Sequence, residues 1–291
     1  MTKKVLLFFS LFSAIFFCRS QSFIVVDSLS RKPLPYAKIT YGDSGKYADS
    51  KGRFLIDKLN SESVLVDYLG YKEYYFNLSE SNFDTLKMKR EPIALDEVVL
   101  GGKTKKVHLE FLKSSKFLPF FPLGLNNELI VNLIPLKNNA NAIVKTVYFK
   151  LDNDKKNKSI EGVLRINVYD SNQNKIFISS PIRIANGFDG LLKIDLPKNQ
   201  IVFDSKGLSF GMEVIDIKVE ENEQERKIDP FIAVALAKKT TKEYSSTTFL
   251  EYPLSTKKEK IPINDLLQKL MPEKEYKRNL SIAMDLIIQD N

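Results

Sequence analysis

A tight turn between two apolar runs constrains the fold of this chain more than any other feature. Asp49-Ser50-Lys51-Gly52 separates the run 37–41 from the run 53–56, and both runs alternate apolar with polar residues. Such alternation predicts half-buried strands, and Gly52 supplies the positive φ that a tight turn requires. The stretch from Pro33 to Tyr71 therefore predicts a small antiparallel sandwich.

Further short runs of the same kind flank this stretch. They lie at 23–26, 63–68, 72–78 and 83–88, and residues 42–45 read as a turn. Four tyrosines in this region allow two interpretations, namely packing at strand edges with the hydroxyl in water, or a platform that stacks on sugar rings. These are Tyr68, Tyr71, Tyr74 and Tyr75.

The first third of the chain closely resembles the carboxypeptidase regulatory-like domain, a transthyretin-like sandwich of the cell envelope of Bacteroidetes-type bacteria. The resemblance implies a fold and an envelope setting, and it brings no catalytic residue. The sequence departs from the usual pattern of this domain at Ser30-Arg31-Lys32 and at Ala48, which are expected to lie in turns. The matching pieces are Val25-Val26-Asp27, Pro33–Ile39, Asp49–Phe54, Leu69-Gly70-Tyr71 and Leu95–Val99.

The N-terminus has the pattern of a secretory signal peptide. Lys3 and Lys4 precede an apolar run from Val5 to Phe17, which is too short for a membrane anchor, and cleavage after Ser20 is expected. Lipidation of Cys18 is the alternative, but Phe16 and Phe17 are bulky where that processing needs small residues. With cleavage after Ser20, the mature chain would contain no cysteine, hence no disulfide, and no transmembrane span.

The residual charge does not predict a nucleic-acid partner. Removal of the three signal-peptide cations lowers the formal charge from +8 to +5, and the remaining lysines are scattered in short runs typical of solvated turns. The sequence thus predicts an exported protein that is periplasmic, outer-membrane associated or secreted, with no nucleic-acid partner.

Residues 93–106 are expected to link the first sandwich, residues 21–92, to a second region, residues 107–291. Within the linker, Leu95–Leu100 resembles the segment that precedes the plug of TonB-dependent receptors, but about 190 residues cannot form such a barrel. A last strand or a bridge between the regions is the interpretation we favour.

The second region reads as a second β-sandwich or a jelly roll. One helix is expected at 263–270, and residues 110–122 are read as an irregular aromatic loop that either binds a ligand or seals the protein. Strands are expected at 144–151, 162–169, 175–178, 191–196, 201–203, 208–219, 231–237 and 276–288. The predicted fold class is accordingly all-β.

The residues needed for most catalytic sites are missing from the sequence. His108 is the single histidine, which excludes the ligand set of a zinc carboxypeptidase, and it is read as a surface side chain of the linker. No Gly-x-Ser-x-Gly elbow or phosphate-binding glycine loop occurs. Asp152-Asn153-Asp154 is read as a plain turn in preference to a calcium loop. No catalytic, cofactor-binding or metal residue is predicted.

Three functions remain open at this point. The leading one is a non-catalytic adaptor or structural component that contacts another envelope protein through an exposed strand edge. The second is a carbohydrate-binding accessory module with polysaccharide as its partner. The third is a hydrolase that uses paired carboxylates. The presence of a single histidine does not exclude it, because such an enzyme needs only two carboxyl groups.

Overall fold

The chain divides into two compact units, each of which is described by itself. The computed structural model describes residues 20–57, 63–81, 83–91, 103–111, 120–135, 142–152, 160–197, 201–219, 229–238, 244–255, 259–272 and 277–289. The first unit comprises residues 1–92 with 254–257, and the second comprises residues 93–253 with 258–291.

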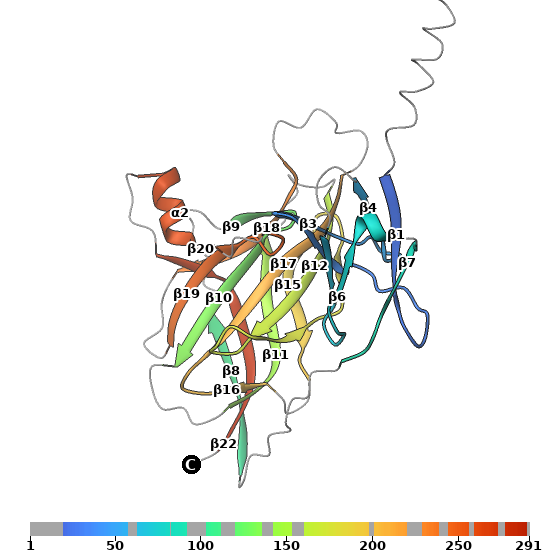
Figure 1. Cartoon of the computed structure of the whole chain (residues 1–291). Helices are drawn as coiled ribbons and strands as arrows, with labels where there is room; N and C mark the ends of the chain where they lie inside the picture. Colours follow the sequence, from blue (N-terminus) through green and yellow to red (C-terminus); the bar gives the residue numbers. More distant parts are fainter. Residues whose placement is uncertain are drawn as a thin grey trace, which may run out of the picture. The chain divides into compact units, whose positions relative to one another are not determined.

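The first unit is a sandwich of two sheets (Figure 1). In the three-stranded sheet, β1 (Ser20–Asp27) lies between β4 (Arg53–Asp57), which is antiparallel to it, and β7 (Thr85–Met88), which is parallel. The four-stranded sheet has the order β3-β2-β5-β6. Its strands are β2 (Lys38–Tyr41), β3 (Ser44–Tyr47), β5 (Ser63–Asp67) and β6 (Tyr74–Asn77), and a 3-10 turn η1 (Leu78–Glu80) follows β6.

Alternation along these strands places one side chain in two in a shared core. Phe23 and Val25 of β1 pack with Ile39 of β2 and Val66 of β5, so the core lies between the two sheets. Gly52 has φ +72°, and a Cβ there would lie 2.8 Å from the carbonyl oxygen of Val25. The turn therefore requires glycine for two reasons, the backbone conformation and the close approach of β1.

The second unit contains two larger sheets that enclose one core. The seven-stranded sheet has the order β13-β12-β17-β10-β19-β20, with β14 also paired to β12. Its strands are β10 (Glu128–Pro135), β12 (Ile160–Tyr169), β13 (Lys175–Ile178), β14 (Ile182–Ile184), β17 (Leu208–Val219), β19 (Tyr244–Glu251) and β20 (Lys260–Pro262).

The eight-stranded sheet has the order β21-β18-β11-β22-β8, with β15 and β16 paired to β11 and β9 paired to β18. Its strands are β8 (Thr104–Phe111), β9 (Phe120–Gly124), β11 (Ala142–Asp152), β15 (Asp189–Asp195), β16 (Val202–Phe203), β18 (Phe231–Lys238), β21 (Arg278–Leu280) and β22 (Ile282–Gln289). Leu164 and Phe210 of the first sheet share a core with Phe149 and Met284 of the second, as in a sandwich.

The all-β prediction is confirmed, and α2 (Ile263–Leu270), the one α-helix within the described residues, has the predicted bounds. Several local predictions were wrong. Residues 44–45, read as a turn, begin β3, and residues 120–122, read as an irregular loop, lie in β9. Phe120 stacks on Phe231 of β18 with ring centroids 6.2 Å apart. Residues 120–122 form a strand because they pair with β18, and such pairing between distant parts of the chain cannot be read from the sequence.

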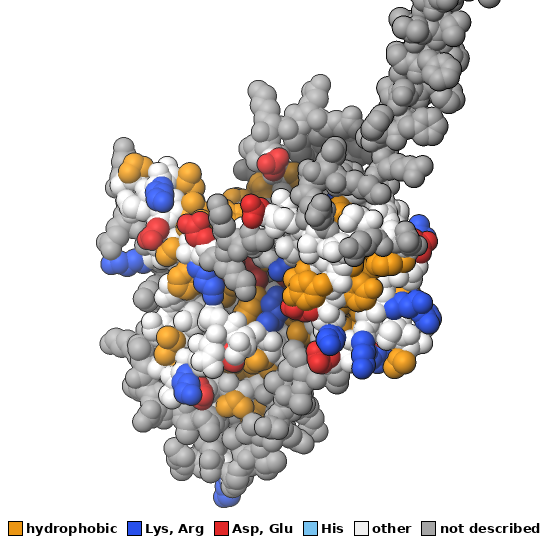
Figure 2. All heavy atoms as spheres, in the orientation of Figure 1, with side chains coloured by type: hydrophobic (Ala, Val, Ile, Leu, Met, Phe, Trp, Pro, Cys, Tyr) orange, Lys and Arg blue, Asp and Glu red, His pale blue; other side chains and the backbone are white. Residues whose placement is uncertain are grey.

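Some predictions fall outside the described residues. These are the signal peptide, the Leu95–Leu100 segment, the 112–119 part of the aromatic loop and most of the Asp152–Asp154 turn. Within the described part of the chain, no helix is both long and apolar enough to cross a membrane. On the face drawn in Figure 2, charged side chains of both signs lie among hydrophobic and neutral ones.

Candidate functional site

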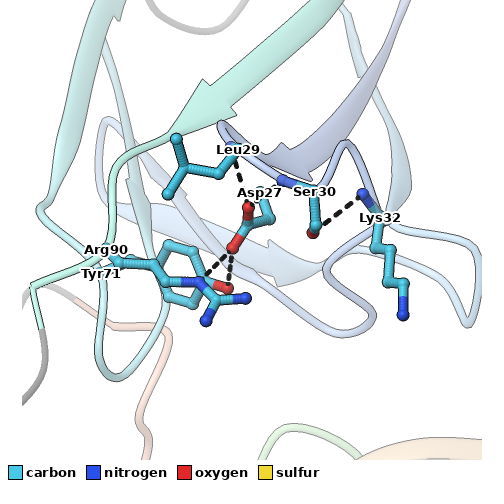
Figure 3. A network of polar contacts seen from close by, with 6 residues as sticks. All are labelled: Asp27, Leu29, Ser30, Lys32, Tyr71 and Arg90. Atoms are coloured by element: carbon cyan, nitrogen blue, oxygen red, sulfur yellow. Dashed lines mark hydrogen bonds and ion pairs between the residues drawn. The ribbon is translucent and has the colours of Figure 1, made fainter.

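The first of three polar networks lies at the end of β1. Asp27 is buried, and its Oδ1 accepts hydrogen bonds from the backbone N–H groups of Leu29 and Ser30 at 2.9 and 2.7 Å. Its Oδ2 accepts from the Tyr71 hydroxyl at 2.7 Å and from Arg90 Nε at 2.5 Å (Figure 3). The carboxylate therefore has four donors.

These donors favour the ionised form of Asp27. The N–H of Ser30, then Arg90 and Tyr71, hold the pKa of Asp27 well below its usual range, against the opposing effect of burial. Burial and the neighbouring carboxylate raise the pKa of Tyr71. Two pieces of the sequence motif, Val-x-Asp and Gly-Tyr, thus meet through their side chains, a role that the sequence alone did not assign to them.

The second network lies on β10, β12 and β17 of the second unit. Glu128 and Glu213 are both 1% exposed, and both accept hydrogen bonds from Asn167 Nδ2, at 2.8 and 3.0 Å. The Tyr169 hydroxyl lies 2.8 Å from each oxygen of the Glu128 carboxylate. Arg165 stands opposite Glu213 in the β12–β17 register, so a cation accompanies the two carboxylates.

This network is placed by strand alternation. Leu164, Ile166 and Val168 point into the core, so Arg165, Asn167 and Tyr169 lie on the other face of β12. Gly211 of β17 is opposite Asn167, and a Cβ at Gly211 would lie 1.9 Å from Glu128 Oε1. The Glu128 carboxylate therefore occupies space that a side chain at position 211 would fill. Burial, then Glu128, raise the pKa of Tyr169 far above its usual value.

The third network contains the single histidine. His108 lies in β8 and not in a linker as expected, because β8 begins at Thr104 and pairs with β22. His108 Nδ1 is 2.6 Å from Asp285 Oδ1, and the Tyr148 hydroxyl donates to Asp285 Oδ2 at 2.7 Å. His108 and Asp285 are 51% and 41% exposed, in agreement with the predicted surface position of His108.

The pKa of Asp285 reflects two opposing effects. Burial raises it, but the hydrogen bonds from His108 and Tyr148 outweigh burial, so that it lies below its usual value. An Asp–His pair is also half of a hydrolytic triad. The third member is not formed, because within the described residues no Ser or Thr hydroxyl bonds to His108, and Thr146 on the neighbouring strand bonds to Asp195.

The tyrosines of the first unit favour the packing interpretation. Tyr68, Tyr71 and Tyr74 are partly buried against the core, and the Tyr68 and Tyr71 rings meet edge to face at 81°. Tyr75 is exposed and bonds to Glu73. Three of the four rings therefore pack, and they do not form a coplanar platform for sugar.

The described residues contain no group of three or more His, Cys, Asp or Glu side chains that could hold a metal ion. The paired carboxylates that the hydrolase hypothesis needs do exist as Glu128 and Glu213. Both are buried and share one amide donor, whereas a glycosidase carboxyl group must reach its substrate.

Comparison with known proteins gives no family. No protein-family model and no curated protein matches the chain. A solved structure of the cysteine protease and lectin-like domains of Cwp84, a surface layer associated protein of Clostridium difficile, aligns at 12% identity with a TM-score of 0.31, covering 96% of this chain and 60% of that one. A second Cwp84 structure, after propeptide cleavage, aligns at 12% identity and TM-score 0.31, covering 85% and 52%.

The VP2 subviral particle of infectious bursal disease virus aligns at 11% identity and a TM-score of 0.26, covering 94% of this chain and 62% of that one. The alignments thus cover only 52% to 62% of the length of these structures. Likeness at these TM-scores supports no functional argument.

Proposed function

We propose that this chain is an exported, non-catalytic binding protein of the bacterial cell envelope that engages an envelope protein through the edge strand β8. One observation carries the proposal. β8 is eight residues long and, in the described part of the chain, pairs only with β22. Such an edge can accept an extended segment of another protein as an additional strand.

The side chains of β8 indicate the chemistry of the partner. Val107 and Leu109 pack against the core, while Lys106, His108 and Glu110 are exposed. Lys103, Thr104 and Lys105 are also exposed, so the beginning of the strand is basic. An extended segment that is acidic at the matching end would pair with the strand and neutralise these lysines.

Lysines on an edge strand also have a protective role, since they discourage unwanted strand addition. The two roles differ in what charge reversal does. If the lysines recruit a partner, reversal weakens one specific complex. If they protect the edge, reversal leaves specific binding unchanged.

The polar networks support a non-catalytic role. The carboxylates of Glu128 and Asp27 are bound by internal donors, and Asp285 is bound by His108 and Tyr148. General acid–base catalysis requires a carboxyl group that exchanges a proton with a substrate. Side chains that hold strands and turns together in this way contribute to stability.

The test is photo-crosslinking in native cells with a photoreactive residue in place of Thr104, which is exposed on β8, and with one in place of Lys269 on α2 as the control. Bound polysaccharide is analysed alongside bound protein. We expect one protein adduct from position 104, reduced about tenfold by Lys103→Glu with Lys106→Glu. The matched pair Lys218→Glu with Lys269→Glu, at exposed positions of β17 and α2, should leave this adduct unchanged.

Two outcomes would refute the proposal. An adduct that survives charge reversal at Lys103 and Lys106 would show that the basic edge is not the contact. Recovered glycan without a stoichiometric protein would replace the adaptor with a carbohydrate-binding module.

A further inference from the structure

The turn that follows β1 presents the most exposed of the large hydrophobic side chains in the described residues. Leu29 is 82% exposed, whereas Phe23 and Val25, which precede it on β1, are buried. Figure 3 shows Leu29 beside the Asp27 carboxylate at the end of the strand, with Lys32 on the far side of the same turn. An isolated exposed leucine needs no explanation by itself, so its setting decides the argument.

The turn is held by its backbone. The N–H groups of Leu29 and Ser30 donate to Asp27 Oδ1, and the N–H of Arg31 donates to the Asp27 carbonyl oxygen at 3.0 Å. The N–H of Ser28 donates to the carbonyl oxygen of Met88 at 2.9 Å. Arg31 adopts φ +61°, a left-handed conformation that is uncommon for arginine. Leu29 is thus exposed on a turn with little conformational entropy left to lose on binding.

Exposed cations lie in the same turn and just after β7. Arg31 and Lys32 belong to the turn and are exposed, and Arg90 reaches Asp27 from the end of β7 with its side chain 59% exposed. Lys89 is exposed next to Arg90, and its carbonyl oxygen accepts from the N–H of Lys72.

The acidic groups of this region cancel these charges only in part. The Asp27 carboxylate compensates Arg90, and Glu91 is exposed beside Arg90, so the excess positive charge is carried by Arg31, Lys32 and Lys89. In Figure 2, Lys and Arg side chains, with Asp or Glu side chains among them, lie near hydrophobic ones at the lower edge of the region occupied by β1 and β7.

We propose that this turn docks on an anionic phospholipid bilayer, with Leu29 inserted at the level of the acyl-chain boundary and Arg31, Lys32, Lys89 and Arg90 on the headgroups. An exposed apolar side chain on a turn that also carries exposed cations gains both from burial and from the negative surface potential of such a membrane. The inference concerns the first unit alone and does not depend on the partner of β8.

The chain contains no tryptophan, which permits a direct test. Leu29→Trp places a single fluorophore on the turn, and Leu270→Trp, at the 68% exposed end of α2, is the control. The mature protein is used, with its N-terminus read by mass spectrometry so that residues 5–17 are known to be absent. We expect vesicles of phosphatidylethanolamine and phosphatidylglycerol to shift the emission of the Leu29→Trp variant to shorter wavelength and to leave that of the control unchanged.

Vesicle co-sedimentation provides the second readout. Leu29→Ser should weaken binding about tenfold, and Leu270→Ser should not. Arg31→Gln with Lys32→Gln should weaken binding to a similar extent and reduce its dependence on salt. Vesicles of phosphatidylcholine alone should bind weakly.

Two results would overturn the inference. Binding that responds to salt but not to Leu29→Ser, with no change in emission from the Leu29→Trp variant, would show adsorption by charge without insertion. Absence of vesicle binding, combined with a blue shift only in the presence of an envelope protein, would assign the turn to a protein pocket.

Discussion

The two units each bury a carboxylate in a polar network, but they build the network from different materials. Around Asp27, two of the four donors are backbone N–H groups from the next three residues, and Arg90 compensates the charge directly. Around Glu128, the donors are side chains of Asn167 and Tyr169, about 40 residues away along the chain, and a second carboxylate shares the same amide.

Only one of the two networks is expected to fail locally. The Asp27 network closes one turn, so its loss should loosen the segment that carries Leu29 while the sandwich persists. The Glu128 network joins β10, β12 and β17, so its loss should affect the whole sheet. A buried carboxylate deprived of its donor pays the full cost of desolvation.

The largest effect is expected from Asn167→Ala. This change removes the amide that donates to both Glu128 and Glu213. The loss of two hydrogen bonds to buried charges should lower the free energy of unfolding by about 3 kcal/mol. Denaturant unfolding monitored by circular dichroism measures it. Asn174→Ala, in the exposed turn before β13, is the matched control and should be nearly neutral. Equal effects of the two variants would contradict the comparison.

Asp27→Asn should have a smaller global effect and a larger local one. The amide side chain retains the size of the carboxylate but loses its charge and one acceptor, so the hold on Leu29 and Ser30 weakens. Hydrogen exchange at these two amides should accelerate, while exchange in β10 and β12 stays as in the wild type. Acceleration throughout the first unit would show that Asp27 supports the sandwich as well as the turn.

The two networks should also respond to opposite extremes of pH. The pKa of Asp27 is lowered on folding, so its contribution is present above the unfolded value of about 3.9 and is lost as pH falls towards the folded value. The pKa of Tyr169 is raised, so its contribution is present below about 10 and is lost as pH rises beyond that.

The free energy of unfolding, measured against pH for the wild type, Asp27→Asn and Tyr169→Phe, separates the acid-sensitive contribution from the alkali-sensitive one. Asp27→Asn should approach the wild type in stability below about pH 4, and Tyr169→Phe should do so above about pH 10. If both variants run parallel to the wild type over the whole range, neither group is coupled to folding through its ionisation.

The sequence predicted the first unit better than the second because its signals are local. Gly52 is a turn residue on sequence grounds and has positive φ in the structure. In the second unit, β12 was predicted for the same reason, from the clean alternation at Val163–Tyr169. The meeting of Asp27 with Tyr71 and Arg90 joins positions 44 and 63 residues apart, and no spacing rule displays it.

The Glu128 network was missed for a related reason. β10 was not predicted, since Leu129-Ile130-Val131 is a continuous apolar run in which alternation is hidden, and Ile130 is buried on the face opposite the core residues. β19 was missed because Ser245-Ser246-Thr247-Thr248 is polar. Thr248 is nevertheless buried, and its hydroxyl accepts from the N–H of Leu280 at 2.9 Å. Buried hydrogen bonds replace apolar contacts there.

The smallest expected effect distinguishes the donors of Asp27 from one another. Tyr71→Phe removes one of four hydrogen bonds to the carboxylate but keeps the ring, which packs edge to face on Tyr68 at 5.4 Å, so the loss should be about 1 kcal/mol. Tyr75→Phe removes a bond to the exposed Glu73 and should give no measurable change. Thermal unfolding of both variants measures the pair. A Tyr71→Phe loss as large as that of Asn167→Ala would mean that the turn network is as cooperative as the sheet network, and the contrast between the two units would then disappear.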